Sequence, residues 1–103
     1  MVYNTEMEYE VRQTAVFSGW LKALKDNTAK IAIARRIVRL GNGNFGDSKS
    51  VGDKVFELRI DVSKGYRVYF TNKDGKIVIL LVGGDKSSQQ SDIRAAKEMA
   101  GEV

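Results

Sequence analysis

Two arginines in the middle of the chain occupy positions suited to binding a phosphate. In two neighbouring segments apolar side chains alternate with polar ones, and matching the apolar faces allows Arg59 to lie opposite Arg67 and Glu57 opposite Tyr69. Like charges opposite one another are unfavourable in a sheet, whereas two guanidiniums bind the oxygens of one phosphate well. Lys86, just past the next apolar run, can approach the same place. The alternative is an ordinary polar sheet face on which Glu57 neutralises the arginines.

A second concentration of charge lies between residues 20 and 50. This stretch has a net charge of +5, from Lys22, Lys25, Lys30, Arg35, Arg36, Arg39 and Lys49 against Asp26 and Asp47. We expect most of these side chains to form a solvated outer face. The functional alternative is an electrostatic contact with nucleic acid, in which the cations displace counterions from phosphates.

The composition excludes several kinds of catalysis. The chain has no cysteine and no histidine, which rules out zinc sites built on these residues and any imidazole or thiol catalysis. Residues 41–46 match the dinucleotide fingerprint G-x-G-x-x-G, but that motif requires a strand before it and a helix after it. Here a helix precedes and a strand follows, so Gly41 or Gly43 is better interpreted as a helix C-cap. We therefore predict no metal and no cofactor.

The hydrophobic pattern predicts a strand and two helices in the first part of the chain. A short strand over residues 8–14 is followed by a helix that Thr14 caps. Asp26-Asn27 ends that helix, and Asn27 can cap a second one. The apolar stripe of the second helix consists of Ile33, Ile37 and Leu40. So short a break predicts an antiparallel helical hairpin.

From residue 51 the hydrophobic period changes to two, which predicts strands. Turns are expected at Ser63-Lys64-Gly65 and at Asp74-Gly75. The apolar run 77–82 is typical of a central strand covered on both faces. Ser87 and Gln90 resemble a capping box that opens a last helix. The predicted fold is an α+β domain: β-α-α, a three-stranded antiparallel meander, then α, with the helical hairpin on one face of the sheet.

Length and charge limit the class of protein. The 103 residues, 43% of them apolar, suit a single domain over residues 1–103. The net charge of +4 permits an anionic partner without establishing one. No apolar run approaches the roughly 18 residues of a membrane helix, and the polar, acidic start is unlike a signal peptide. We therefore expect a cytoplasmic protein with no membrane association.

Three segments together resemble a known family. Residues 55–61 (VFELRID), 65–70 (GYRVYF) and 80–89 (LLVGGDKSSQ) are similar to segments of the addiction module killer proteins. These are HigB-like toxins within the RelE/ParE superfamily of bacterial type II toxin–antitoxin systems. Residues 17–21 and 36–47 fit as well, so the likeness covers nearly the whole chain. It implies the fold β-α-α-β-β-β-α, which agrees with the order predicted above.

The resemblance implies a ribosome-dependent, metal-independent endoribonuclease that cuts mRNA in the ribosomal A site. In such toxins the ribose 2′-OH attacks the adjacent phosphate and leaves a 2′,3′-cyclic phosphate. By position, Arg67 corresponds to an arginine that holds the scissile phosphate. Arg59 corresponds to a basic residue that binds the phosphate or helps to activate the 2′-OH, and Lys86 to one that stabilises the leaving 5′-oxygen. Glu57 falls where some members use a carboxylate as general base and others a lysine.

The chain departs from the family near its C-terminus. Many relatives have a Tyr or His there, as general acid or as a platform for a base, and Asp92 occupies the approximate position. Either Asp92 or Tyr69 takes that role, or the activity is weaker or different. Phe17 and Trp20 are expected in the core. The residues expected to contact RNA or the ribosome are Lys49, Lys54, Lys22, Lys25, Arg35 and Arg36.

The resemblance also implies partners and leaves three functions open. Besides the ribosome and mRNA, it implies a cognate antitoxin, usually of the helix-turn-helix type, that can form a heterotetramer with the toxin. The first function is an mRNA interferase, and the second is a ParE-like toxin that inhibits DNA gyrase by protein–protein binding. The third is a degenerate toxin that binds its antitoxin as a co-repressor. The basic cluster favours the first, and the missing C-terminal acid keeps the second open.

Overall fold

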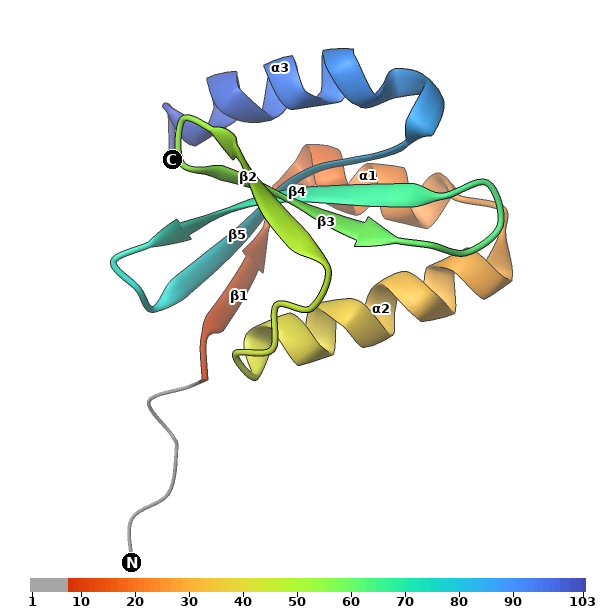
Figure 1. Cartoon of the computed structure of the whole chain (residues 1–103), viewed down its shortest axis with the longest axis horizontal. Coiled ribbons are helices and arrows are strands. Elements are labelled where there is room, and N and C mark those ends of the chain that lie inside the picture. Colours follow the sequence, from red (N-terminus) through yellow and green to blue (C-terminus); the bar gives the residue numbers. More distant parts are fainter. Residues whose placement is uncertain (1–7) are drawn as a thin grey trace, which may run out of the picture.

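A computed structural model of the chain describes residues 8–103, in which three α-helices surround one five-stranded sheet (Figure 1). The acidic start of the sequence, from which we expect no signal peptide, lies outside this range except for Glu8. The elements in chain order are β1 (Glu10–Gln13), α1 (Ala15–Ala23), α2 (Asn27–Gly41), β2 (Ser48–Gly52), β3 (Val55–Ile60), β4 (Tyr66–Lys73), β5 (Ile77–Asp85), the short 3₁₀ helix η2 (Lys86–Ser88) and α3 (Gln89–Ala100).

The sheet has the strand order β1-β5-β4-β3-β2. Strands β2 to β5 form an antiparallel meander, and β1 adds to β5 in parallel. The α+β fold class with a helical hairpin and a C-terminal helix is confirmed, and the sheet has one strand more than predicted. Strand β2 was missed because its sequence, Ser-Lys-Ser-Val-Gly, has a single large apolar residue and no apolar alternation. Backbone pairing with β3 holds it at the sheet edge.

The N-terminal ends of α1 and α2 are both capped by side chains. The Oγ1 of Thr14 accepts a hydrogen bond from the Phe17 N–H at 3.0 Å and donates one to the Leu81 carbonyl at 2.7 Å, which confirms the predicted cap and attaches it to β5. In α2 the cap is Asp26 and not Asn27. The Asp26 residue is extended, and its Oδ1 accepts from the Ala29 N–H at 3.0 Å.

The helical hairpin and the sheet enclose the larger core. Phe17, Ile33 and Leu40 are fully buried against β3, β4 and β5, whereas Ile37 is partly buried. Trp20 packs against the same core, as expected, so closely that a Cβ on Gly83 would lie 2.2 Å from its ring. This glycine lets α1 lie directly on β5.

Helix α3 covers the opposite face of the sheet and closes a second, smaller core (Figure 1). Ala96 is fully buried there against β3, β4 and β5. The predicted capping box of Ser87 and Gln90 is wrong. Ser87 lies within η2, where its N–H donates to the Asp85 carboxylate at 2.8 Å, and α3 begins only at Gln89.

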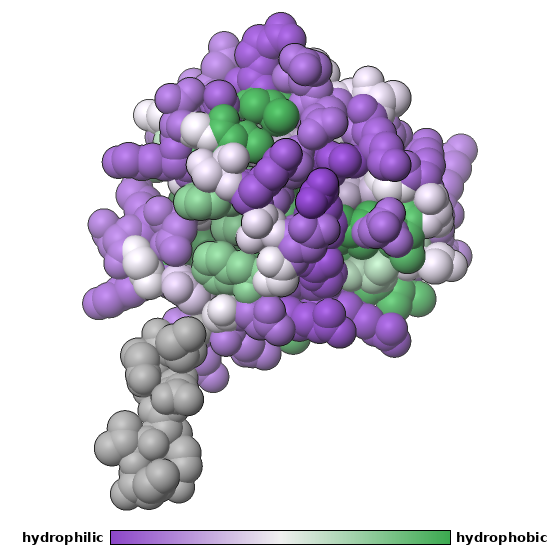
Figure 2. Space-filling model, in the orientation of Figure 1, coloured by the Kyte–Doolittle hydropathy of each residue, from purple (hydrophilic) through white to green (hydrophobic). Residues whose placement is uncertain are grey.

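The glycine-rich segment after α2 is a helix end. Gly43 has a φ of 88°, its N–H donates to the Leu40 carbonyl at 3.0 Å, and the Asn44 N–H donates to the Arg39 carbonyl at 2.9 Å. This closes the last turn with a glycine in the left-handed region, as predicted. No helix within residues 8–103 is long and apolar enough to span a membrane. On the face viewed in Figure 2 the surface is mostly hydrophilic, with hydrophobic residues in small separate patches.

Candidate functional site

Strands β3 and β4 pair in the register that the alternation predicts. Arg59 lies opposite Arg67, and Glu57 lies opposite Tyr69. Each arginine has its own carboxylate, since one guanidinium nitrogen of Arg59 is 3.1 Å from Oδ1 of Asp47 and Nε of Arg67 is 3.6 Å from Oε2 of Glu57. These two ion pairs offset the repulsion between cations on facing strands.

Lys86, the first residue after β5, lies near the two arginines. Its side chain lies across the turn between β3 and β4, where a Cβ on Gly65 would be 2.8 Å from Cε of Lys86. Gly65 also has a φ of 84°, so both the backbone conformation and the space favour glycine here. The structure thus brings the three cations to one cavity of about 300 Å³, whose lining residues are Asp47, Arg59, Ile60, Asp61, Gly65, Tyr66, Arg67 and Lys86.

Glu57 is the buried carboxylate that pairs with Arg67, and it does not itself line the cavity. Its side chain is fully buried, and Oε2 accepts hydrogen bonds from the Tyr69 hydroxyl at 2.9 Å and from Nε2 of Gln89 at 2.8 Å. The alternation places Glu57 and Tyr69 on the polar face of the sheet, but this part of the face is not open, because α3 packs over it. Gln89 was missed, and nothing in its sequence context marks it as the partner of a buried carboxylate.

Two further candidate residues, Tyr69 and Arg67, are largely buried. Burial raises the pKa of the Tyr69 phenol, and the hydrogen bond to Glu57 adds to this effect, so Tyr69 stays protonated at neutral pH. The alternation places Arg67 among the polar side chains that point away from the larger core, but its side chain is only 12% exposed. The guanidinium of Arg67 reaches from the buried Glu57 to the cavity.

Asp92 lies on α3 beside β5, away from the cavity lining. Its Oδ2 accepts a hydrogen bond from the Ser88 hydroxyl at 2.6 Å, and a Cβ on Gly84 would lie 1.9 Å from the same oxygen. The carboxylate is thus packed on the backbone of β5. Both neighbours of this carboxylate, Ser88 and Gly84, lie where the start of α3 meets β5 and not at the arginine cavity.

The six basic residues expected to contact RNA or the ribosome lie in separate regions of the structure. Lys49 is exposed and pairs in register with Glu57, on the sheet face that carries the arginines. Arg36 has a structural contact, because its guanidinium donates to the Arg59 carbonyl at 2.9 Å and so ties α2 to β3. Three other residues of this set are exposed on the helical hairpin, away from the cavity: Lys22, Lys25 and Arg35.

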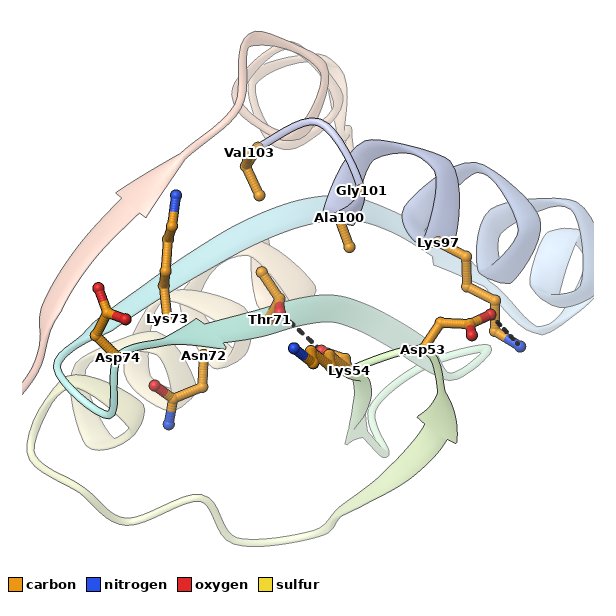
Figure 3. A pocket seen from close by; sticks show the side chains of 10 residues that line it. All are labelled: Asp53, Lys54, Thr71, Asn72, Lys73, Asp74, Lys97, Ala100, Gly101 and Val103. Atoms are coloured by element: carbon orange, nitrogen blue, oxygen red, sulfur yellow. Dashed lines mark hydrogen bonds and ion pairs between the residues drawn. The ribbon is translucent and has the colours of Figure 1, made fainter.

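Lys54 lies in a second cavity, of about 630 Å³, near the end of α3 (Figure 3). The Thr71 hydroxyl donates to the Lys54 carbonyl at 2.7 Å, and Lys97 forms an ion pair with Asp53 at 3.7 Å. This cavity mixes lysines with aspartates and shares no lining residue with the arginine cavity. Within residues 8–103 no group of three or more His, Cys, Asp or Glu side chains is arranged to hold a metal ion.

Solved structures share the fold. An arginine-to-alanine double mutant of the E. coli toxin RelE, in the free state, matches with a TM-score of 0.71 and 17% identity over 89% of this chain and 98% of that chain. The intact E. coli RelBE toxin–antitoxin complex matches with a TM-score of 0.58 and 16% identity, over 75% of this chain and 95% of the matched chain. These likenesses establish a RelE-like fold.

Closer relationships appear at the level of sequence. An uncharacterised protein of Haemophilus influenzae is 54% identical over 97 residues, which cover 94% of this chain and 98% of that protein. A sequence model of the family described as "Phage derived protein Gp49-like (DUF891)" matches residues 19–100, which include α2, α3 and every strand from β2 to β5. The chain therefore belongs to the phage-derived Gp49-like family.

Proposed function

We propose that this chain is the toxin of a toxin–antitoxin pair and a ribosome-dependent mRNA endoribonuclease of the HigB-like kind. The observation that carries the proposal is the convergence of Arg59, Arg67 and Lys86 on one cavity of about 300 Å³ at the end of the sheet. The RelE-like fold supports it, because the solved neighbours are a toxin and a toxin–antitoxin complex.

In the proposed reaction, the 2′-oxygen of a ribose attacks the adjacent phosphorus, and the bond from phosphorus to the 5′-oxygen of the next nucleotide breaks. Negative charge grows on the non-bridging oxygens of the phosphate as the new bond forms. The guanidiniums of Arg59 and Arg67 are fixed N–H donors that stabilise this charge. The ammonium of Lys86 supplies a proton to the leaving 5′-oxygen. The products are a 2′,3′-cyclic phosphate and a 5′-hydroxyl.

The proton of the attacking 2′-OH needs an acceptor that lines the cavity. Glu57 is fully buried and holds Arg67, and the Asp92 carboxylate accepts from Ser88. The carboxylates in the cavity lining are Asp47 and Asp61, and we assign one of these two as the general base. In this scheme Glu57, Tyr69 and Asp92 support the site without touching the RNA.

The partner proposed for this chain is a cognate antitoxin of the helix-turn-helix type, in an assembly such as a heterotetramer. Ribosome and mRNA are the proposed targets, in the cytoplasm. Lys49, on the face of the arginines, is the proposed contact for the RNA backbone nearest the cavity. The single sheet with helices on both faces supports one domain.

The test is to express the protein in a bacterium from an inducible promoter and to map mRNA ends by primer extension. The proposal predicts new ends at fixed positions within codons, in translated messages only. The same message with its start codon removed is the control, and it should stay intact. Intact translated mRNA together with induction of the DNA-damage response would contradict the proposal and indicate a gyrase-type toxin.

A further inference from the structure

The outward face of α2 carries an apolar stripe that nothing in the described chain covers. Ile31 is 54% exposed and Val38 is 64% exposed, and Ala34 lies exposed between them. The spacing of three and then four residues puts all three side chains on one side of the helix. The opposite side of α2, with Ile33 and Leu40, packs on the sheet and is buried in the core. The side chains of the stripe make no contribution to that core.

The stripe continues into a groove between the two helices of the hairpin. The groove has a volume of about 390 Å³ and is lined by Gln13, Ser18, Leu21, Lys22, Lys30 and Ala34. Ala34 belongs to both the stripe and the groove, which makes them one surface. Lys30 bridges the helices across it, since its Nζ donates to the Lys22 carbonyl at 3.2 Å.

The charged side chains within the two helices are all cations. Neither α1 nor α2 contains an aspartate or glutamate. Lys22 and Lys30 line the groove on one side of the stripe, and Arg35 and Arg39 are exposed on the other side of α2. The result is an apolar strip between two rows of cations.

We propose that this surface docks an acidic amphipathic helix of a partner protein. The phosphates of an RNA would pair with the cations, but Ile31 and Val38 would remain in contact with water or phosphate. A helix with apolar residues on one side and carboxylates at its flanks matches both the strip and the two cationic rows. From Ile31 to Val38 the stripe is about 10 Å long, at 1.5 Å per residue, which fits about two turns of such a helix.

The docking surface is independent of the proposed nuclease site. Its residues come from α1, α2 and the end of β1, whereas the arginine cavity is formed by the loop before β2, by β3, by β4 and the turn that precedes it, and by η2. A partner on the hairpin therefore leaves the cavity open unless another part of it covers that end of the sheet. The proposal stands whether or not the chain cuts RNA.

The test measures fluorescence anisotropy of two labelled synthetic peptides with the full chain. One peptide, of about 20 residues so that it forms a helix, has leucines at helical spacing and glutamates elsewhere, and the other has the same composition in scrambled order. We expect the amphipathic peptide to bind at least about tenfold more tightly. Ile31→Ser with Val38→Ser should weaken its binding about tenfold or more, since exposed positions tolerate this change without loss of fold.

Matched controls separate the apolar and the electrostatic contributions. Val103→Ser removes another exposed apolar side chain and should leave binding unchanged, and Arg39→Glu should weaken binding whereas Arg94→Glu should not. Equal binding of both peptides would overturn the proposal, because charge alone would explain it. Failure of the amphipathic peptide to bind would also overturn it. So would a single-stranded RNA that binds tightly and loses affinity in the Ile31→Ser, Val38→Ser variant.

Discussion

Arg67 has a different environment at each end of its guanidinium. One end is 3.6 Å from a fully buried carboxylate, and the side chain as a whole is 12% exposed and reaches the cavity. Arg59, by contrast, is 44% exposed and pairs with the exposed Asp47. An exposed pair contributes little to stability, whereas a buried charge without its partner is costly. The two arginines of the site therefore differ in what their loss does to the fold.

Arg67→Ala is expected to destabilise the protein by about 3–5 kcal/mol, because Glu57 is left as a buried carboxylate without a cation. Adding Glu57→Gln should restore part of this loss, since position 57 then no longer carries a buried charge without a cation. Arg59→Ala should change the unfolding free energy by less than about 1 kcal/mol. Urea unfolding of the three variants measures these differences. An Arg67→Ala protein as stable as the wild type would contradict the assignment of this ion pair.

Two glycines on β5 determine how the helices pack on the sheet. Gly83 lies under the Trp20 ring of α1, and Gly84 lies under Asp92 of α3. A side chain at either position would force a whole helix away from the strand. Such small residues are visible in the sequence, but only the structure identifies the neighbours that require them.

Gly83→Ala is expected to destabilise the protein by about 1–3 kcal/mol, because its Cβ would lie 2.2 Å from the Trp20 ring. Gly19→Ala is the matched control. Gly19 is within α1 with nothing closer than 4 Å to its Cβ position, so alanine should stabilise the helix by about 1 kcal/mol. Chemical unfolding of both variants gives the comparison, and equal effects would argue against the close packing of α1 on β5.

The alternation of apolar residues was enough to predict the pairing of Arg59 with Arg67, because the side-chain period of two admits few registers. It was not enough to predict which polar positions stay exposed. Glu57 and Tyr69 alternate with core residues as surface residues do, and their burial depends on α3, more than 20 residues further along the chain. Strand β2 has no pattern of its own, since its pairing with β3 comes from backbone groups.

For the whole molecule, two carboxylates connect segments that are distant in the sequence and make stability sensitive to acid. Hydrogen bonding from the Ser63 hydroxyl, and next from the Ala29 N–H, lowers the pKa of Asp26 below its usual 3.8. The hydroxyl and N–H of Ser87, and then Lys64, lower the pKa of Asp85 in the same way. A carboxyl with a lowered pKa stabilises the fold above its unfolded-state value, and this contribution is lost as the pH falls through the folded-state value.

The free energy of unfolding is therefore expected to fall as the pH drops below about 4. Urea titrations between neutral pH and about pH 3 measure this dependence. The double variant Asp26→Asn, Asp85→Asn should be less stable at neutral pH and should lose less stability on acidification. An identical loss in the double variant and the wild type would show that other carboxylates determine the acid response.

The proposed nuclease activity of the arginine cavity can be measured as cleavage of a short mRNA on purified bacterial ribosomes, with the protein at saturating concentration. We expect that the wild type leaves a 2′,3′-cyclic phosphate, and that Arg59→Ala and Lys86→Ala each cut at least about 100-fold more slowly. Arg94→Ala, which removes an exposed arginine of α3, should cut at the wild-type rate. An intact message with the wild type, or full cleavage by Arg59→Ala, would show that the arginine cavity is not a ribonuclease site.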